Sequence, residues 1–175
     1  MVEIIKFGKY EGNSVEQIAI KDYKYLRWII ENVPIKKPSL DERIRYVDFV
    51  GNNFISQLNC VIPNCNSPAE NMSVYYHQEM DSRSSDKDFI YCSSECFRKD
   101  PKVTGEKRKI QFVPINFNST LSSTKSDTNN LMKLILECMG IKPGRKSKEY
   151  LEDFFNHCEL KNRFPNKEIN ELYQF

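Results

Sequence analysis

Four cysteines in two closely spaced pairs constrain this chain more than any other feature of its sequence. The first pair has a Cys-x4-Cys pattern, the second has a Cys-x3-Cys pattern, and 26 residues separate the pairs: Cys60, Cys65, Cys92 and Cys96. This spacing fits one tetrahedral site in which four thiolates hold a single zinc ion. Four thiolates leave no open position for water or substrate, so we expect the zinc to shape the protein and to perform no chemistry.

Each cysteine pair lies where the backbone is expected to reverse. Pro63 and Asn64 are typical turn residues inside the first pair. Ser93 and Ser94 can open a helix that carries the second pair. Two thiolates of each pair can therefore converge on one ion.

The segment between the pairs predicts a β-hairpin. Residues 73–77 and 89–91 are β-rich, and the acidic, Ser-rich stretch 79–88 is expected to form the loop between them. A knuckle, a hairpin and a helix in this order are typical of a treble-clef finger. We expect that fold for the zinc module.

The other cysteines and a nearby histidine receive separate interpretations. Cys138 and Cys158 lie on apolar faces of predicted helices, where a free cysteine behaves as a small hydrophobe, so we assign both to the core. His77 lies on the predicted hairpin and could replace one of the four cysteines as a zinc ligand. That alternative stays open at the level of sequence.

Composition indicates a soluble intracellular protein. Of the 175 residues, 39% are hydrophobic and 29% are charged. No segment approaches 18 consecutive apolar residues, and residues 1–10 lack the apolar run of a signal peptide, so we expect no membrane partner. In a reducing compartment paired cysteines are typical metal ligands. The net charge is only +2, so any affinity for nucleic acid has to come from local patches.

The expected fold class is α+β, with a treble-clef four-cysteine zinc finger between an N-terminal αβ module and a helical C-terminal region. We expect a strand-helix module over 1–58 and the finger with its basic extension over 59–117. Residues 118–130 are nearly all Ser, Thr, Asn, Asp and Lys, which predicts a flexible linker. The helical C-terminal region is expected over 131–175.

Local signals subdivide the N-terminal module. Residues 2–7 predict a strand, and Gly8 and Gly12 flank a turn. Three helix starts have N-capping signals: Ser14 with Gln17, Asp22, and Ser39 with Glu42. We expect the third of these helices, which starts after Pro38, to run to Leu58.

The segments after the finger also have clear periodicities. Residues 110–117 alternate as a strand does, and Pro114 confines that strand to a sheet edge. Apolar stripes predict one helix that stops at Gly140, a second over 151–158, and a last short helix over 169–173.

Two basic clusters are candidates for nucleic-acid contact. The first follows the second cysteine pair and faces only Asp100 and Glu106: Arg98, Lys99, Lys102, Lys107, Arg108 and Lys109. The second surrounds Pro143 and Gly144: Lys142, Arg145, Lys146 and Lys148. Such runs are most often solvated loops. The zinc module beside the first cluster favours DNA or RNA as its partner, with phosphate contacts that position the protein without reading sequence.

Nothing in the sequence predicts an enzyme. There is no Gly-rich phosphate loop, no nucleophile elbow, and only two histidines that could act as bases. We therefore expect no catalytic residue and no small-molecule substrate.

The string Tyr91-Cys92-Ser93-Ser94-Glu95-Cys96 resembles the FCS-type zinc finger, with Tyr in place of the usual Phe, and Cys60-x4-Cys65 is similar to its first half. Such a finger between a helical and a basic segment resembles the viral late transcription factor 2 family of large nucleocytoplasmic DNA viruses, such as African swine fever virus. The resemblance implies a zinc-dependent role in late viral transcription, in the cytoplasmic virus factory or the nucleus of a host cell. It also implies the four cysteines as ligands and the transcription machinery as a partner. The alternative is an adaptor whose finger binds a host regulatory protein or a polymerase partner.

A second resemblance covers residues 4–33. The string Phe7-Gly8-Lys9-Tyr10-x-Gly12-x-Ser14, followed by Tyr25-Leu26-Arg27-Trp28, is similar to the C-terminal module of exonuclease-X-like proteins. We find no acidic metal-binding set of a nuclease, so the resemblance implies at most an accessory role beside a nuclease. The side chains of Lys9, Tyr10, Arg27 and Trp28 could stack on and neutralise a nucleic-acid strand. We nevertheless expect Trp28 to be buried in a small core.

Overall fold

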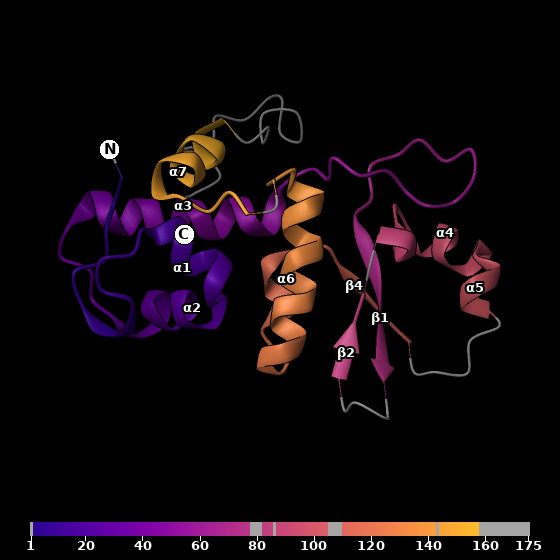
Figure 1. Ribbon diagram of the computed structural model, residues 1–175, viewed down its shortest axis with the longest axis horizontal. Helices are drawn as coiled ribbons and strands as arrows, with labels where there is room; N and C mark the ends of the chain where they lie inside the picture. Colours follow the sequence, from indigo (N-terminus) through magenta and orange to yellow (C-terminus); the bar gives the residue numbers. More distant parts are fainter. Residues whose placement is uncertain (1, 78–81, 86, 105–109, 143, 158–175) are drawn as a thin grey trace. The chain divides into compact units, whose positions relative to one another are not determined.

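The computed structural model describes residues 2–77, 82–85, 87–104, 110–142 and 144–157, which form two compact units (Figure 1). The first unit combines residues 2–54 with the described residues from 142 onwards, and the second contains residues 55–141. Helices and a small sheet are both present, so the chain is a mixed α and β protein. The boundaries of these units differ from those expected from sequence, for the reasons given below.

The first unit starts with a turn and contains no N-terminal strand among its described residues. The Ile5 N–H donates to the Asn13 carbonyl (3.0 Å), the Gly12 N–H donates to the Ile5 carbonyl (2.9 Å), and Ile4 forms only an isolated bridge with Ser14. The prediction of a strand over 2–7 is therefore wrong, because Ile4 and Ile5 bond only to the short turn that follows them and to no other strand that the structure describes.

Glycine conformations and a short 3-10 helix, η1 (Gly8–Tyr10), form the turn that was predicted. Gly8 has a φ of 69° and Gly12 has a φ of 84°, a region of backbone space that suits glycine. The N-cap of the first α-helix, Ser14, follows shortly after this turn.

Three helices follow: α1 (Val15–Lys21), α2 (Tyr23–Asn32) and α3 (Pro38–Asn53). The Ser14–Gln17 capping box and the Asp22 cap are present as predicted. The capping box expected from Ser39 is wrong, because α3 already starts at Pro38, where a proline is well tolerated at the first helical position.

Helix α3 also ends earlier than the expected Leu58. Its last residue is Asn53, and Phe54 has an extended backbone with a ψ of 161°. The side-chain amides of Asn52 and Asn53 donate to the carbonyls of the preceding turn, a local bonding pattern that is common where helices end.

Trp28 is exposed, which corrects the expectation that it is buried. Its side chain is 48% exposed, whereas Tyr23, Leu26 and Ile29 on the same helix are fully buried. Trp28 lies two residues after Leu26, and therefore about 200° around the helix from it.

Helix α7 (Lys148–His157) belongs to the first unit although it lies far along the chain. The Tyr46 hydroxyl donates to the Phe155 carbonyl (2.7 Å), and Arg43 Nη1 donates to Asn156 Oδ1 (2.7 Å). The Nε of Arg43 also donates to Oε1 of Glu16 (2.6 Å), which is fully buried on α1. A buried ion pair thus connects α1, α3 and α7.

The second unit contains an antiparallel sheet built on β1 (Asn71–His77). Strands β2 (Ser82–Ser84) and β3 (Ile90–Tyr91) pair with successive parts of β1, and β4 (Ile110–Pro114) pairs along the opposite edge. Strand β2 lies in the stretch 79–88 that the sequence predicts as a loop, so that prediction is wrong for residues 82–84. Their sequence carries no strand signal, and they form a strand because they pair with β1. Strand β4 ends at its proline, as an edge strand can.

Helix α6 (Lys125–Met139) lies beside this sheet (Figure 1). Its buried stripe includes the predicted positions: Leu131, Leu134, Ile135, Cys138 and Met139. Gly140 ends the helix with a φ of 84°, as predicted. Helix α6 belongs to the second unit and α7 to the first, so the region expected as one piece over 131–175 is divided.

The segment 118–130 is ordered, which corrects the linker interpretation. It includes most of η4 (Phe117–Thr120) and the first turns of α6. The Thr124 hydroxyl accepts a hydrogen bond from the Asp127 N–H (3.3 Å), and Asp127 and Thr120 are buried. The same Ser, Thr, Asn and Asp residues that mark linkers also cap helices, so composition alone could not separate the two.

Among the described residues, no helix is both long enough and apolar enough to cross a membrane. Cys158 and the helix expected over 169–173 lie outside the described residues.

Candidate metal centre

A narrow hairpin positions the first cysteine pair. The Cys60 N–H donates to the Ser67 carbonyl (2.9 Å), and Asn59 forms a β-bridge with Pro68. These contacts hold the two arms of residues 59–68, which we call the knuckle, side by side. Among residues 59–68 only Cys60 is buried, so apolar packing contributes little to this segment.

The tip of the knuckle is the turn that the sequence predicted. The Cys65 N–H donates to the Ile62 carbonyl (3.0 Å), which closes a four-residue turn with Pro63 and Asn64 at its centre. Asn64 has a φ of 66°, as the third position of a type II turn requires after a proline. The turn brings Cys65 back towards Cys60.

Helix α4 (Ser94–Lys99) positions the second cysteine pair. The Ser93 hydroxyl accepts a hydrogen bond from the Cys96 N–H (3.3 Å) and caps the helix, as predicted. Cys92 therefore lies just before the cap and Cys96 lies in the first turn. The Val61 N–H donates to the Ile90 carbonyl (3.0 Å), which joins the knuckle to β3 two residues before Cys92.

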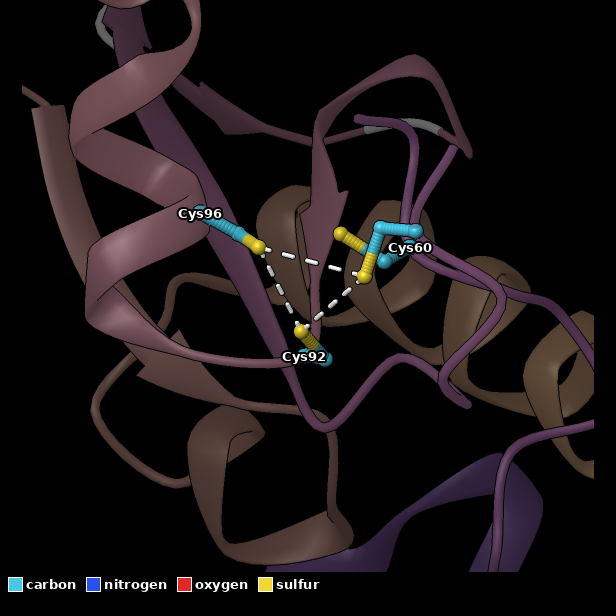
Figure 2. Close-up of side chains that lie close together, drawn as sticks. Cys60, Cys92 and Cys96 are labelled. Carbon is cyan, nitrogen blue, oxygen red and sulfur yellow. Dashed lines mark hydrogen bonds between the residues drawn. The ribbon is translucent and has the colours of Figure 1, made fainter. Parts of the chain in front are cut away.

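The four sulfur atoms form a compact cluster, and all lie within 4.8 Å of one another. The Sγ–Sγ distances are 3.5 Å for Cys65–Cys92, 3.5 Å for Cys92–Cys96 and 3.9 Å for Cys96–Cys65. Figure 2 shows the side chains of Cys60, Cys92 and Cys96 converging on this cluster. The sequence prediction that these four residues meet agrees with this arrangement.

The sulfur spacing matches a metal cage and excludes disulfides. A tetrahedral ion with bonds of about 2.3 Å to sulfur has sulfur–sulfur edges of about 3.8 Å. A disulfide would bring two sulfurs to about 2.05 Å, and all four cysteines are free. The cluster can therefore hold one metal ion.

Backbone N–H groups also point at the sulfur atoms. The N–H groups of Ile62 and Cys92 donate to the sulfur of Cys60, and the Ser67 N–H donates to the sulfur of Cys65. The Ser67 bond, with the neighbouring thiols, lowers the pKa of Cys65 to about 7. Burial raises the pKa of Cys60 and of Cys92. A bound cation would allow all four to ionise together, because it offsets the repulsion between thiolates.

A buried hydrogen bond fixes the helix behind the cluster. Tyr91 is fully buried, and its hydroxyl donates to Asp100 Oδ2 (2.8 Å). Oδ1 of Asp100 accepts from the Lys102 N–H (2.8 Å) at the start of α5 (Pro101–Thr104). The Tyr91 ring also meets Phe97 of α4 edge to face, with centroids 5.4 Å apart. Sequence reasoning treated Asp100 only as a charge facing the basic cluster and missed this buried role, although an Asp directly before Pro101 is a typical helix-capping signal.

The described part of the first basic cluster is exposed. Arg98 and Lys99 lie on α4, and Lys102 lies on α5 with its Nζ 5.6 Å from the centroid of Phe89. Asp100, between them, is buried and bonded to Tyr91, so it does not oppose these cations at the surface. The other three candidates, Lys107, Arg108 and Lys109, lie outside the described residues.

Cys138, assigned to the core, and His77, the alternative zinc ligand, have distinct positions. Cys138 is fully buried on α6, as predicted, and burial raises its pKa to about 11. The backbone of His77 ends β1, but its side chain lies outside the described part of the structure. Its alternative role as a ligand stays a prediction.

Comparison with known proteins adds one match. Residues 5–33 match the family described as Exodeoxyribonuclease X-like C-terminal, which confirms the similarity seen in the N-terminal segment. No curated protein and no solved structure matches the chain. The match covers the turn, α1 and α2, and it does not include the cysteine cluster.

Proposed function

We propose that the cysteine cluster holds one structural Zn²⁺ and that the knuckle, hairpin and helix α4 form a treble-clef finger around it. The observation that carries this proposal is the clustering of all four sulfurs within 4.8 Å, with distances of 3.5 to 3.9 Å among Cys65, Cys92 and Cys96, close to the edge of a zinc–thiolate tetrahedron. Zn²⁺ suits four thiolates better than Mg²⁺ or Ca²⁺, which prefer oxygen ligands. The ion is structural, because four thiolates leave no position for a reacting water.

The finger presents exposed cations on helices that the metal holds in place. Arg98 and Lys99 lie within one turn of Cys96, so their backbone positions follow from the metal site. We infer that these residues, with Lys102, contact the phosphates of a nucleic acid. The match of residues 5–33 to a module of exodeoxyribonuclease X-like proteins supports a nucleic-acid setting.

The proposed function is therefore a zinc-dependent, non-enzymatic nucleic-acid-binding regulator. Its resemblance to the FCS-type finger and to viral late transcription factor 2 supports a role in late viral transcription. The sequence departs from that finger at Tyr91, where Phe is usual, and the Tyr91 hydroxyl has a buried partner in Asp100. The substitution is thus compatible with the same finger architecture.

A salt titration with a DNA duplex tests the nucleic-acid contact. Replacing Arg98 and Lys99 together by Ala should remove two phosphate contacts and reduce the steepness of the log affinity–log salt plot by about 1.8. The matched control replaces Lys125 and Lys133, two exposed lysines of α6 in the same unit, and should leave the slope unchanged. Equal slopes for the two variants, with zinc retained in both, would show that the nucleic acid contacts residues other than Arg98 and Lys99.

A protein-binding adaptor is the second candidate function. The exposed face of α4 carries the acid Glu95 beside Arg98 and Lys99, and a mixed face of this kind also suits a protein partner. Cross-linking in cells separates the two candidates. Late promoters or polymerase subunits should be recovered if the transcription role is correct. Recovery of signalling proteins alone, with no DNA or RNA affinity at 50 mM salt, would favour the adaptor.

A further inference from the structure

An aromatic pair lies on α2, in which Trp28 is exposed and Tyr25 is half-buried. The rings of Tyr25 and Trp28 are stacked, with centroids 5.5 Å apart and planes inclined by 24°. Only two large apolar side chains among the described residues are exposed, and Trp28 is the more exposed of them. The buried residues of α2 are Tyr23, Leu26 and Ile29, so Trp28 does not serve as core packing.

The Gly8–Tyr10 turn holds the first of these rings in position. The hydroxyl of Tyr25 accepts a hydrogen bond from the Lys9 N–H (3.2 Å), and the Tyr10 ring meets Tyr25 edge to face at 5.1 Å. A side chain at Gly8 would collide with the Tyr25 hydroxyl, so the glycine makes this approach possible. Tyr25 is thereby fixed before any ligand arrives, and it backs Trp28 with a rigid surface.

A basic loop contacts the same turn from its other end. Lys148 Nζ donates to the Gly12 carbonyl (2.5 Å), and the Gln17 side chain donates to the Lys146 carbonyl (3.1 Å). This basic loop and the first residue of α7 contain four cations and no carboxylate: Lys142, Arg145, Lys146 and Lys148. The first three of these side chains are exposed.

Two further exposed lysines lie close to the aromatic pair. Lys21 ends α1, with its Nζ 5.4 Å from the centroid of Tyr10, and Lys24 directly precedes Tyr25. Lys9 is bonded to Asp22 (2.9 Å) and Glu11 is exposed in the same turn, so the cations available to a phosphate are Lys21 and those of the basic loop. The surface therefore combines the exposed ring of Trp28 with cations on both sides of one turn.

We propose that this surface of the first unit binds single-stranded nucleic acid. An unpaired base stacks on Trp28, and the neighbouring phosphates contact Lys21, Lys142, Arg145 and Lys146. Single strands fit because stacking requires an open base face, which a duplex buries between its base pairs. This binding site is separate from the zinc finger and does not depend on the function proposed for the finger.

The only tryptophan of the chain is Trp28, so its fluorescence reports on this surface alone. The zinc-loaded full chain is titrated with a dT15 oligonucleotide at 50 mM salt, and the emission should be quenched to saturation. Contact with about three phosphates gives a slope near −2.1 for a single strand, or about 20-fold weaker binding at 200 mM salt. An unchanged emission at 50 mM salt would overturn the proposal, and equal quenching by a duplex would overturn the preference for single strands.

Substitutions locate the contact. In a background that carries Arg98→Ala and Lys99→Ala, Trp28→Ala should weaken binding of labelled dT15 by about 10-fold, and Trp28→Phe should restore most of it. Replacing Lys142, Arg145 and Lys146 by Ala should flatten the salt dependence. The same affinity for the parent Arg98→Ala, Lys99→Ala variant with and without Trp28→Ala would refute the stacking role. The finger variant with intact Trp28 should still show quenching, so failure of the finger proposal and failure of this one are distinguishable.

Discussion

The two units of this protein are stabilised in different ways. In the first unit, five of the seven residues of α1 are buried, and the core of α2 and α3 is apolar. In the second unit, α4 has no buried residue, and the knuckle of residues 59–68 buries only Cys60. Burial of apolar surface stabilises the first unit, whereas the segments around the cysteine cluster need another source of free energy.

This difference shows where a metal matters in a small protein. Apolar burial contributes roughly 25 cal/mol per Å² removed from water, so a helix without buried side chains gains little from it. For these segments, a zinc ion supplies the stabilising free energy that apolar burial supplies elsewhere. The sheet and α6, which have apolar residues of their own, should depend on the ion less than the knuckle and α4 do.

Loss of the metal should produce the largest effect. Cys92→Ser should release zinc and remove hydrogen-exchange protection from the knuckle and α4, because structural zinc contributes on the order of 10–16 kcal/mol in small fingers. Trp28 emission and the urea midpoint of the first unit should not change. Cys138→Ala is the control and should retain zinc. Full zinc occupancy in Cys92→Ser would refute the ligand set, and a shift of the Trp28 midpoint would show that the two units unfold together.

Breaking the buried ion pair should destabilise the first unit alone. Arg43→Met leaves Glu16 buried without its partner, which should cost about 3–5 kcal/mol in the free energy of unfolding followed by Trp28 fluorescence. The matched control is Arg45→Met on the same helix, whose pair with Asp41 is exposed and should contribute less than about 1 kcal/mol. Zinc content should stay at one per chain in both variants. Equal losses of stability would contradict the role of burial.

Two glycine substitutions separate backbone strain from the contact with Tyr25. Gly12→Ala adds a side chain at positive φ in open space, so it should cost about 1–2 kcal/mol through strain alone. Gly8→Ala has the same strain and also collides with the Tyr25 hydroxyl, so its loss of stability should be larger and Trp28 emission should change. Urea unfolding measures both. Identical values for the two variants would show that the Tyr25 contact contributes nothing.

The smallest effect concerns Cys138 at high pH. Burial raises its pKa to about 11 from an ordinary value of about 9, so the folded state keeps a proton that the unfolded state loses. Stability should therefore fall as pH rises above about 9, by less than about 1 kcal/mol at pH 9.5. Unfolding of the zinc-loaded full chain followed by circular dichroism measures this loss, and Cys138→Ala should abolish it.

At pH 8 iodoacetamide should leave Cys138 unlabelled, and rapid labelling would contradict its burial.

Local chemistry was predictable from the sequence. The Ser14–Gln17 capping box, the Asp22 cap, the Pro63–Asn64 turn and the stop at Gly140 are all present. Each depends on groups a few residues apart, so the sequence carries the whole signal. The cysteine cluster was also predictable, because metal sites impose a characteristic spacing on their ligands.

Long-range assembly was not predictable in the same way. The contact between Arg43 and Asn156 spans 113 positions, and that between Arg43 and Glu16 spans 27. No periodicity or capping signal connects such positions, so the sequence predicts α7 as part of a C-terminal region instead of the first unit. Trp28 is a different case, since its position opposite Leu26 on the helix already indicated exposure.

The return of α7 to the first unit has a consequence for synthesis. The ribosome adds residues 55–141 after α3 and before α7, which takes roughly 4 to 17 seconds at rates of about 5–20 residues per second. During that interval Glu16 and Arg43 have been synthesised, but Asn156 and the α7 backbone that bond to Arg43 have not. The nascent N-terminal segment is therefore incomplete until the second unit has left the ribosome, although its own helices appear first.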